Sequence, residues 1–572
     1  MPDPLWGPVV QADGTTFRLW APGVDRLDLM LGEDARPMEA GPDGWWSRHV
    51  PGAGPGTDYA FRLPGGLTVP DPAARAQAGD VHGPSRIDVD GHAWRHETPA
   101  RPWHEAVVCE LHVGTFTPEG TFRAAIDKLP LLAEAGYTAI EIMPVAQFGG
   151  DRGWGYDGVL LFAPHPAYGT PDDLRALVDA AHGHGLMVML DVVYNHFGPD
   201  GNYLGAYAPD FFDSSRETPW GAAIAFDRAP VRAFFVENAL HWLDAYRLDG
   251  FRFDAIDHVR DPGGDPEILV EIARAIRERR PGAWLATEDN RNVTHLHERD
   301  GDRTPLMSGE WNDDWHNAAH VLATGETEGY YEAFADRPDR MLARALAEGF
   351  AWQGETQPDG QARGAPSGHM APDAFVDFLQ NHDQIGNRAR GERLLSLCRP
   401  ETYRALQAML MLSPHVPLMF MGDEWGARDP FLFFADFDGA LGLAVTEGRR
   451  REFAGFQGFA GTVPDPIDPA TFEMSKLDWF GRGGPWLDRF RSLARLRAER
   501  IVPLIPGTGP GAGRVLDALE GCVAVDWRLG GGTLRMRANL GAARADLAPA
   551  EGETIHADGT LGEPASCQIA LA

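Results

Sequence analysis

The chain has 572 residues, enough for three or four domains of ordinary size, or for fewer if one is a large barrel. Hydrophobic residues make up 44% and charged residues 23%, which excludes a disordered chain, collagen and a bundle of membrane helices. Lys and Arg total 51 against 83 Asp and Glu, and the net charge of −32 argues against nucleic acid and membrane surfaces as partners.

The cysteines and the N-terminus indicate a cytoplasmic protein. Cys109, Cys398, Cys522 and Cys567 lie far apart and form no CxxC pair, so neither a disulfide framework nor a zinc cluster is expected. The first ten residues carry neither the basic nor the apolar region of a signal peptide. No apolar run reaches the roughly 18 residues that a membrane span requires.

Residues 1–95 are expected to form a small β-sandwich. Apolar and polar residues alternate in the runs 17–22, 24–31, 44–50 and 57–63, and turns rich in Gly and Pro separate these runs. Short alternating strands with dense turns are typical of antiparallel sandwiches. We expect this module to pack against its neighbour rather than to bind sugar independently.

Residues 96–495 change to a rhythm of strand, loop and amphipathic helix. One such helix, 171–185, begins with Pro171 after Thr170, a typical N-cap residue. About eight strand–helix units favour a (β/α)8 TIM barrel, and no GxGxxG motif supports a dinucleotide-binding sheet. The expected strands are 106–111, 138–143, 186–193, 250–254, 283–288, 305–311, 374–379 and 416–421.

Residues 496–572 are again rich in turns and alternate in polarity, which predicts a small antiparallel β domain. We therefore predict an α/β protein, with a catalytic TIM barrel between an N-terminal β-sandwich and a C-terminal antiparallel β domain. The barrel carries a short insertion after its third strand, at about 197–228.

Polar side chains follow four of the expected barrel strands. The carboxyl ends of barrel strands form the active-site mouth of this fold, so we expect these side chains to lie close together. Arg252 and Asp254 are two residues apart and therefore share one face of their strand. The strand-end residues are Asp191 and His196, Arg252 and Asp254, Glu288, and His382 and Asp383.

Three acids and a cation at one barrel mouth suit the cleavage of a glycosidic bond with retention of configuration. That reaction needs a carboxylate nucleophile and a protonated carboxyl roughly 5–5.5 Å apart. We expect Arg252 to hold Asp254 ionised, and neighbouring carboxylates to raise the pKa of Glu288 so that it keeps its proton. A lone acid at a strand end is more often a helix cap or an ion-pair partner, but four polar strand ends in this order favour a catalytic site.

At these residues the sequence resembles the α-amylase superfamily of retaining glycosidases and transglycosylases. The resemblance implies Asp254 as the nucleophile, Glu288 as the general acid/base and Asp383 as the transition-state stabiliser. The segments that carry it are DVVYNH (191–196), GFRFDAIDH (250–258), ATED (286–289) and QNHDQIGN (380–387).

Longer segments are similar to one family within that superfamily, whose members release trehalose from maltooligosyltrehalose. This resemblance covers almost the whole chain and implies cleavage of the α-1,4 bond next to the terminal trehalose unit. The segments are ELHVGTFTPEGTF (110–122), AIEIMPVAQFGGDRGWGYDGV (139–159), WNDDWHNAAH (311–320) and MGDEWGARDPFLFF (421–434).

Other classes remain open at this point. A glycogen branching enzyme, or another α-1,4-glucan-active transglycosylase or amylase, would keep the same three acids. A non-catalytic barrel relative would be expected to lack one acid, and a pure glycogen-binding module would need only the sandwich. The presence of all three acids favours an enzyme.

The expected partners are maltooligosyltrehalose and related α-1,4-glucans. In calcium-dependent amylases the residue that matches Asn195 binds calcium, but residues 197–228 offer no further cluster of oxygen ligands, so we expect no metal and no other cofactor. The expected substrate-binding residues are Trp154 and Tyr156 as a sugar platform, Asn312, Asp313 and Asp314 as a hydroxyl-binding cluster, Asp257, His258 and Gln384 on the acceptor side, and Asp191, His196, Arg252 and His382 near the cleaved bond.

Overall fold

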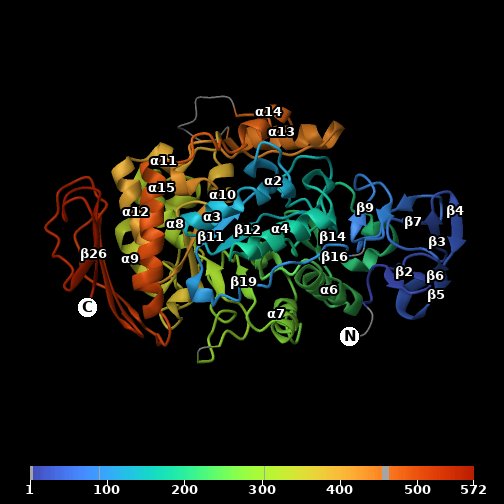
Figure 1. Cartoon of the computed structure of the whole chain (residues 1–572), viewed down its shortest axis with the longest axis horizontal. Helices are drawn as coiled ribbons and strands as arrows, with labels where there is room; N and C mark the ends of the chain where they lie inside the picture. The colour runs from blue at the N-terminus through green and yellow to red at the C-terminus, as the bar shows by residue number, and fades with distance from the viewer. Residues whose placement is uncertain (1–3, 89, 302, 454–462) are drawn as a thin grey trace.

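Eight parallel strands close into a barrel at the centre of the computed structural model, which describes residues 4–88, 90–301, 303–453 and 463–572 (Figure 1). The strands follow one another around the barrel in chain order, and the last pairs with the first. Each coincides with a predicted run, so the predicted TIM barrel is confirmed. The strands are β11 (Val108–Leu111), β12 (Ala139–Ile142), β15 (Met187–Val192), β18 (Gly250–Phe253), β19 (Trp284–Thr287), β20 (Gly309–Trp311), β21 (Phe375–Phe378) and β22 (Val416–Phe420).

Alternating side chains of these strands fill the barrel interior. One apolar cluster contains residues from seven of the eight strands, among them Met189, Trp284, Ala286 and Trp311. Because neighbouring residues of a strand point to opposite faces, the residues between them pack outward against the helices. At the carboxyl ends of the strands the interior positions become polar, which creates the site.

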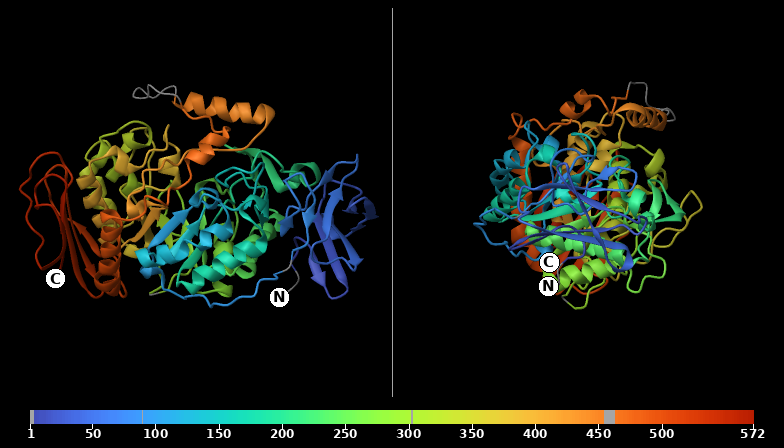
Figure 2. Two further views of the ribbon diagram at one scale, coloured as in Figure 1. Left: turned by 45° about the horizontal axis from the view of Figure 1, so that its top comes forward. Right: turned by 90° about the vertical axis from the view of Figure 1, so that its right-hand side faces the viewer.

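Helices surround the barrel, as the alternating pattern predicted. Helix α4 (Pro171–Gly183) starts with a capping box, in which the Thr170 hydroxyl accepts from the Asp173 amide and the Asp173 carboxylate accepts from the Thr170 amide. The other long helices are α6 (Ala229–Ala245), α7 (Ile268–Arg279), α8 (Asp313–Thr324), α9 (Pro338–Glu348), α12 (Pro400–Leu412) and α15 (Pro485–Leu496). Helices α13 (Gly439–Phe453) and α14 (Pro469–Met474) lie apart from this ring (Figure 2).

Two antiparallel sheets form the N-terminal end of the molecule, as the alternating runs predicted (Figure 1). Trp6 joins them to the barrel, since its indole Nε1 donates to the Pro230 carbonyl oxygen (2.9 Å) and its ring packs on Phe234 of α6. One sheet holds β1 (Val9–Gln11), β2 (Gly14–Trp20), β6 (Trp45–Pro51) and β5 (Glu39–Ala40). The other holds β4 (Asp34–Pro37), β3 (Asp28–Leu31), β7 (Asp58–Arg62), β10 (Ser85–Arg86), β9 (Ala76–Gln77) and β8 (Thr68–Val69).

The insertion after the third barrel strand contains a β-hairpin that the sequence did not predict. A short helix, α5 (Leu204–Tyr207), precedes strands β16 (Phe212–Thr218) and β17 (Gly221–Ile224), which pair antiparallel. The turn between the two strands carries Trp220, whose ring is 45% exposed. This hairpin brings an aromatic side chain to the rim of the barrel mouth.

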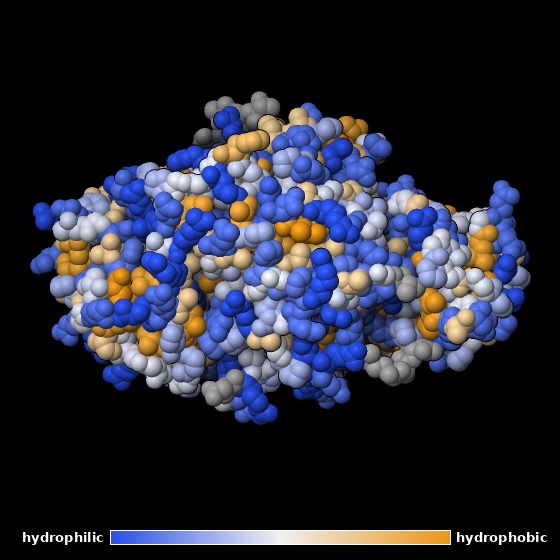
Figure 3. Space-filling view, in the orientation of Figure 1, coloured by the Kyte–Doolittle hydropathy of each residue, from blue (hydrophilic) through white to orange (hydrophobic). Residues whose placement is uncertain are grey.

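A five-stranded antiparallel sheet forms the C-terminal end of the molecule, as predicted. The Trp527 indole of β24 donates to the Leu346 carbonyl oxygen of α9 (2.9 Å), which attaches the sheet to the barrel helices. Figure 3 shows a mainly hydrophilic surface with scattered apolar residues on this face. Among the helices in the described part of the chain, none combines the length and hydropathy needed to cross a membrane. The strands are β23 (Gly513–Val515), β24 (Cys522–Leu529), β25 (Gly532–Asn539), β27 (Ser566–Leu571) and β26 (Glu553–Asp558).

Candidate active site

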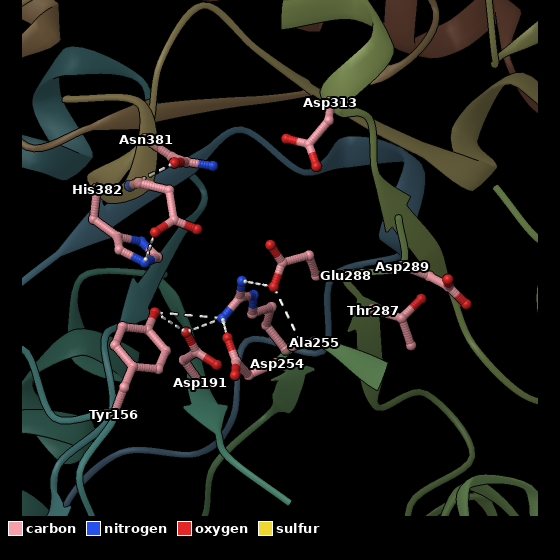
Figure 4. A network of polar contacts seen from close by, with 12 residues as sticks. Tyr156, Asp191, Asp254, Ala255, Thr287, Glu288, Asp289, Asp313, Asn381 and His382 are labelled. Atoms are coloured by element: carbon pink, nitrogen blue, oxygen red, sulfur yellow. Dashed lines mark hydrogen bonds and ion pairs between the residues drawn. The ribbon is translucent and has the colours of Figure 1, made fainter. Parts of the chain in front are cut away.

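Arg252 stands at the centre of the polar cluster at the barrel mouth (Figure 4). Its side chain is fully buried and contacts carboxylates at the ends of three strands. Nη1 donates to Asp191 Oδ2 (2.5 Å) and Asp254 Oδ1 (2.9 Å), and Nη2 donates to Glu288 Oε2 (2.6 Å). The structure therefore brings together strand-end residues that the sequence placed at the barrel mouth, and a single guanidinium contacts three carboxylates.

The surroundings of Asp254 raise its pKa, although Arg252 was expected to favour its ionised form. Burial raises the pKa of Asp254 well above its usual range, and the charges of Glu288 and Asp191 raise it further, while Arg252 opposes this rise. The physical reason is that one buried cation faces several buried carboxylates. Retaining cleavage needs one carboxyl group as acid and one as nucleophile, and the cluster contains carboxyl groups for both roles.

His382 is held as a cation by Glu110, a residue that the sequence analysis did not single out. Glu110 is the third residue of β11, and its carboxylate accepts from the His382 amide (2.9 Å) and from the His382 ring Nδ1 (2.5 Å). Burial lowers the pKa of His382, but the charges of Glu110 and Asp383 outweigh burial and raise it to about 9. The sequence could have indicated Glu110, because it is an acid near the carboxyl end of the first barrel strand.

Asp383 lies in a short helix, α10 (His382–Gly386), whose cap sets its position. The Asn381 side-chain oxygen accepts from the Asp383 amide (2.9 Å), and the Gln384 side chain completes the capping box by accepting from the Asn381 amide. Gln384 Nε2 also donates to Asp313 Oδ1 (3.2 Å). The predicted residues Gln384 and Asp383 therefore lie together beside the carboxylate cluster.

The two predicted platform aromatics occupy different places. Tyr156 lies in the site, where its hydroxyl donates to Asp191 Oδ2 (2.6 Å) and its ring stacks on His382 with centroids 5.0 Å apart. Trp154 is only 7% exposed, and its Nε1 donates to the Leu432 carbonyl oxygen (2.9 Å). Trp154 thus forms part of the wall behind His382, and its role as a sugar platform stays a prediction.

Of the predicted hydroxyl-binding cluster, only Asp313 faces the site (Figure 4). Burial raises its pKa to about 8, with a smaller contribution from Glu288. Asn312 is the fully buried N-cap of α8, and its Nδ2 donates to the Gly349 carbonyl and Asp377. Asp314 is also fully buried and accepts from the amides of Ala351 and Trp352.

The expected sugar-binding role of Asn312 and Asp314 stays a prediction, which their buried contacts do not support. Their oxygen and nitrogen atoms satisfy buried backbone groups, which cannot be left unpaired without a large cost.

The loops after the third and fourth barrel strands meet at the rim of the barrel mouth. The His196 ring stacks on Trp220 with centroids 4.3 Å apart, and the His258 ring meets the edge of the same indole at 5.0 Å. Burial lowers the pKa of His196 to about 4, so this imidazole is neutral. Asp257 lies beside His258, with a carboxylate oxygen 3.7 Å from Nε2. Trp220 is a rim residue that sequence reasoning missed, although an aromatic in a turn-rich insertion was visible.

Asn195 engages its neighbour, since its side-chain oxygen lies 3.1 Å from His196 Nδ1. Within the described residues, a group that could hold a metal ion occurs in the C-terminal sheet, at His556, Asp558 and Cys567. There Arg489 already forms a bidentate ion pair with Asp558 (2.6 and 2.8 Å). The absence of a metal requirement stays a prediction.

Comparisons with known proteins agree with this geometry. The Alpha-amylase catalytic-domain family matches residues 82–214, and a family of unknown function, DUF3459, matches residues 510–568. In a search of solved structures, a Salmonella typhimurium protein described provisionally as an alpha amylase superposes with a TM-score of 0.96, at 52% identity and with 100% of both chains covered. A pullulanase from Bacillus acidopullulyticus, at 19% identity and a TM-score of 0.72, shares the fold.

Curated relatives define the family more narrowly. The malto-oligosyltrehalose trehalohydrolase of Deinococcus radiodurans is 42% identical over 86% of this chain and 83% of its own length. The enzyme of that name from Saccharolobus solfataricus is 39% identical over 86% of this chain and 87% of its own. A 1,4-alpha-glucan branching enzyme from Bacillus caldolyticus is 28% identical over 75% of this chain. The chain therefore belongs to the malto-oligosyltrehalose trehalohydrolase family of the α-amylase superfamily.

Proposed function

We propose that this protein hydrolyses the α-1,4-glucosidic bond next to the terminal trehalose unit of maltooligosyltrehalose, with retention of configuration, and releases trehalose. Two things support the proposal. The chain belongs to a family of glycoside hydrolases that carry this name. The observation that carries the chemistry is the bridge of the buried Arg252 to Asp191, Asp254 and Glu288.

The arrangement suits a double-displacement reaction. In the first step Asp254 attacks the anomeric carbon, and Glu288 gives its proton to the departing glycosidic oxygen. In the second step Glu288 takes a proton from water, and that water releases the sugar from Asp254. Asp383 and the His382 imidazolium bind hydroxyls of the same sugar, where interactions that strengthen in the transition state raise kcat.

Trehalose offers the acceptor side a shape that maltose does not. Its 1,1 linkage is bent and leaves no reducing end, so a rim built for it grips it better than a linear maltose unit. If that grip strengthens as the bond breaks, substrates capped with trehalose gain in kcat as well as in KM. Uncapped chains are then hydrolysed slowly.

Product analysis tests this proposal against a branching enzyme or a general amylase. The purified protein is incubated with trehalose-capped and uncapped maltooligosaccharides of equal length, and NMR follows the products and the first anomer released. We expect free trehalose, an initial α-anomer and a strong preference for capped chains. Equal rates on both substrates, or new α-1,6 branches in place of trehalose, would refute the proposal.

Asp254→Asn tests the nucleophile. An amide cannot attack the anomeric carbon, so we expect kcat to fall by about 10⁴-fold or more, as for other catalytic nucleophiles. The thermal midpoint of unfolding should not fall, since the amide keeps the shape of the side chain. More than a trace of activity, with deamidation excluded by mass spectrometry, would show that Asp254 is not the nucleophile.

A further inference from the structure

Glu310 lies immediately behind the carboxylate proposed as the acid, outside the barrel wall. It is the middle residue of β20 and pairs with Thr287 of β19. Its neighbour Trp311 belongs to the apolar cluster inside the barrel, so Glu310 points to the opposite, outer face. The side chain is fully buried. Glu310 therefore cannot touch a substrate in the barrel mouth.

Both oxygens of Glu310 hold the chain on either side of Glu288. Oε1 accepts from the Asp289 amide (2.6 Å), and Oε2 lies 2.5 Å from the Thr287 hydroxyl. Thr287 and Asp289 are the residues immediately before and after Glu288, and their side chains point away from Asp254 (Figure 4). One buried carboxyl group thus clamps the segment that carries the acid.

The other side of this segment is held by backbone bonds to the neighbouring strand. The Glu288 amide donates to the Phe253 carbonyl oxygen (3.1 Å), and the Glu288 carbonyl oxygen accepts from the Ile256 amide (2.9 Å). The Glu288 carboxylate itself accepts from the Ala255 amide (3.1 Å). Strand β18 and the residues after it therefore hold the segment on one side. On the side toward β20, the Glu310 side chain holds it at Asp289, beyond Thr287.

A buried histidine completes the contacts of Glu310. His297 Nε2 lies 2.7 Å from the Thr287 hydroxyl and 3.3 Å from Glu310 Oε2. Burial lowers the pKa of His297 to about 3, so the ring is neutral. Burial also raises the pKa of Glu310 well above its usual range, and the Asp289 charge adds to this rise. A neutral carboxyl group has the same shape and a similar donor and acceptor set as a glutamine amide.

We infer that Glu310 is a positioning residue for Glu288, which holds the acid at the correct distance from the glycosidic oxygen by clamping Thr287 and Asp289. The inference rests on the proposed role of Glu288 as the acid. A positioning residue of this kind affects proton transfer to the leaving group more than attack by the nucleophile. Its loss should therefore hurt a substrate that needs a proton on its leaving group more than one that does not.

The test compares maltooligosyltrehalose with α-maltosyl fluoride, whose fluoride departs with little help from an acid. For Glu310→Leu, which removes both contacts, we expect kcat on maltooligosyltrehalose to fall by about 100-fold, the size typical of a displaced catalytic group. On the fluoride we expect kcat to fall by less than about 5-fold, and KM to change little on either substrate. Glu310→Gln should restore most of the rate on maltooligosyltrehalose.

Thr287→Val provides a second variant in case Glu310→Leu does not fold. It removes the hydroxyl beside Glu310 and keeps the shape of the side chain, so we expect about a 5-fold fall on maltooligosyltrehalose, equivalent to the loss of one hydrogen bond, and no fall on the fluoride. Asp249→Leu is the matched control. Asp249 is also fully buried and accepts from a backbone amide, that of Val188, and from His182 (both 2.8 Å), but it precedes β18 at the opposite end of the barrel.

The outcomes separate this inference from the proposed function. Equal losses on both substrates for the Glu310 and Thr287 variants, or the same unequal loss for Asp249→Leu, would overturn the positioning role. Glu288→Gln is measured in parallel. If Glu288→Gln also loses activity equally on both substrates, the proposed acid role fails; if only the Glu310 and Thr287 variants do so, the positioning role alone fails.

Discussion

At the residue scale, the guanidinium of Arg252 organises the acids of the site. Its two arms contact carboxylates from three strands, and its planar face lies 4.1 Å from the centre of the Trp311 ring. A lysine has one nitrogen and no planar face, so it cannot reproduce these contacts. The geometry of the acids therefore depends on arginine specifically.

Arg252→Lys is expected to lower kcat by about 100-fold or more, as when a charged or polar group that stabilises a transition state is removed. The positive charge remains, so the thermal midpoint of unfolding should fall far less than for Arg252→Ala. Steady-state kinetics and calorimetry on both variants measure the two effects. A large fall in the midpoint with near-normal kcat would show that Arg252 is structural only.

The pH dependence of the enzyme should report the pair of Glu110 and His382. The pKa of His382 lies at about 9 in the fold against an ordinary 6.5, so its charge stabilises the fold fully below pH 6.5, and this contribution is lost as the pH rises through 9. The charged and polar groups around the ring include Glu110, Asp383, Arg252, Tyr156, Asp191, Glu141 and His112.

Glu110→Gln removes the negative charge that raises the pKa of His382 against the effect of burial, so this pKa should fall. We expect the alkaline limb of kcat/KM to lie near pH 9 in the unmodified protein and to move down by more than about one pH unit, a change of 1.4 kcal/mol, in the variant. An unchanged limb would show that His382 does not need its charge.

At the element scale, two capping boxes allow stability to be separated from catalysis. Thr170 caps α4 on the outer ring, whereas Asn381 caps α10, which carries Asp383. Thr170→Ala and Asn381→Ala should each cost about 1 kcal/mol in the free energy of unfolding. Only Asn381→Ala should also lower kcat, because it frees the Asp383 amide. Denaturant unfolding and kinetics on both variants check this, and similar kcat values would contradict it.

At the scale of the whole molecule, the N-terminal sandwich is joined to the barrel through Trp6. The indole is fully buried and meets the rings of Trp45 and Phe234, both at 5.0 Å. Trp6→Ala should cost about 3–5 kcal/mol, the usual range for a buried tryptophan. Kinetics of the folded variant should be unchanged, since Trp6 contacts Pro230 and Phe234 of the outer helix α6.

Leu5→Ala is the matched control for Trp6→Ala, because Leu5 lies in the same segment and is 47% exposed. Calorimetry should show a lower midpoint for Trp6→Ala and almost none of this change for Leu5→Ala. Equal midpoints for the two variants would mean that the contact through Trp6 contributes nothing to the stability of the sandwich.

The sequence by itself determined the barrel and the core of its site. Apolar runs followed by polar residues predict strands and strand ends locally, and the spacing of two residues between Arg252 and Asp254 places both side chains on one face. The positions of Asp191, Glu288 and His382 followed from the same rule. The boundaries between domains at residues 95 and 495 stay predictions.

Only the tertiary structure decided which polar side chains face the barrel mouth and in which direction their pKa values move. Asp313 and Asp314 are adjacent at the start of one helix. Only Asp314 accepts hydrogen bonds from the amides of Ala351 and Trp352, which lie far along the chain. The raised pKa of Asp254 is likewise a sum over burial and charges from several strands. A local pattern cannot encode these quantities, because they depend on distances between segments that meet only when the barrel closes.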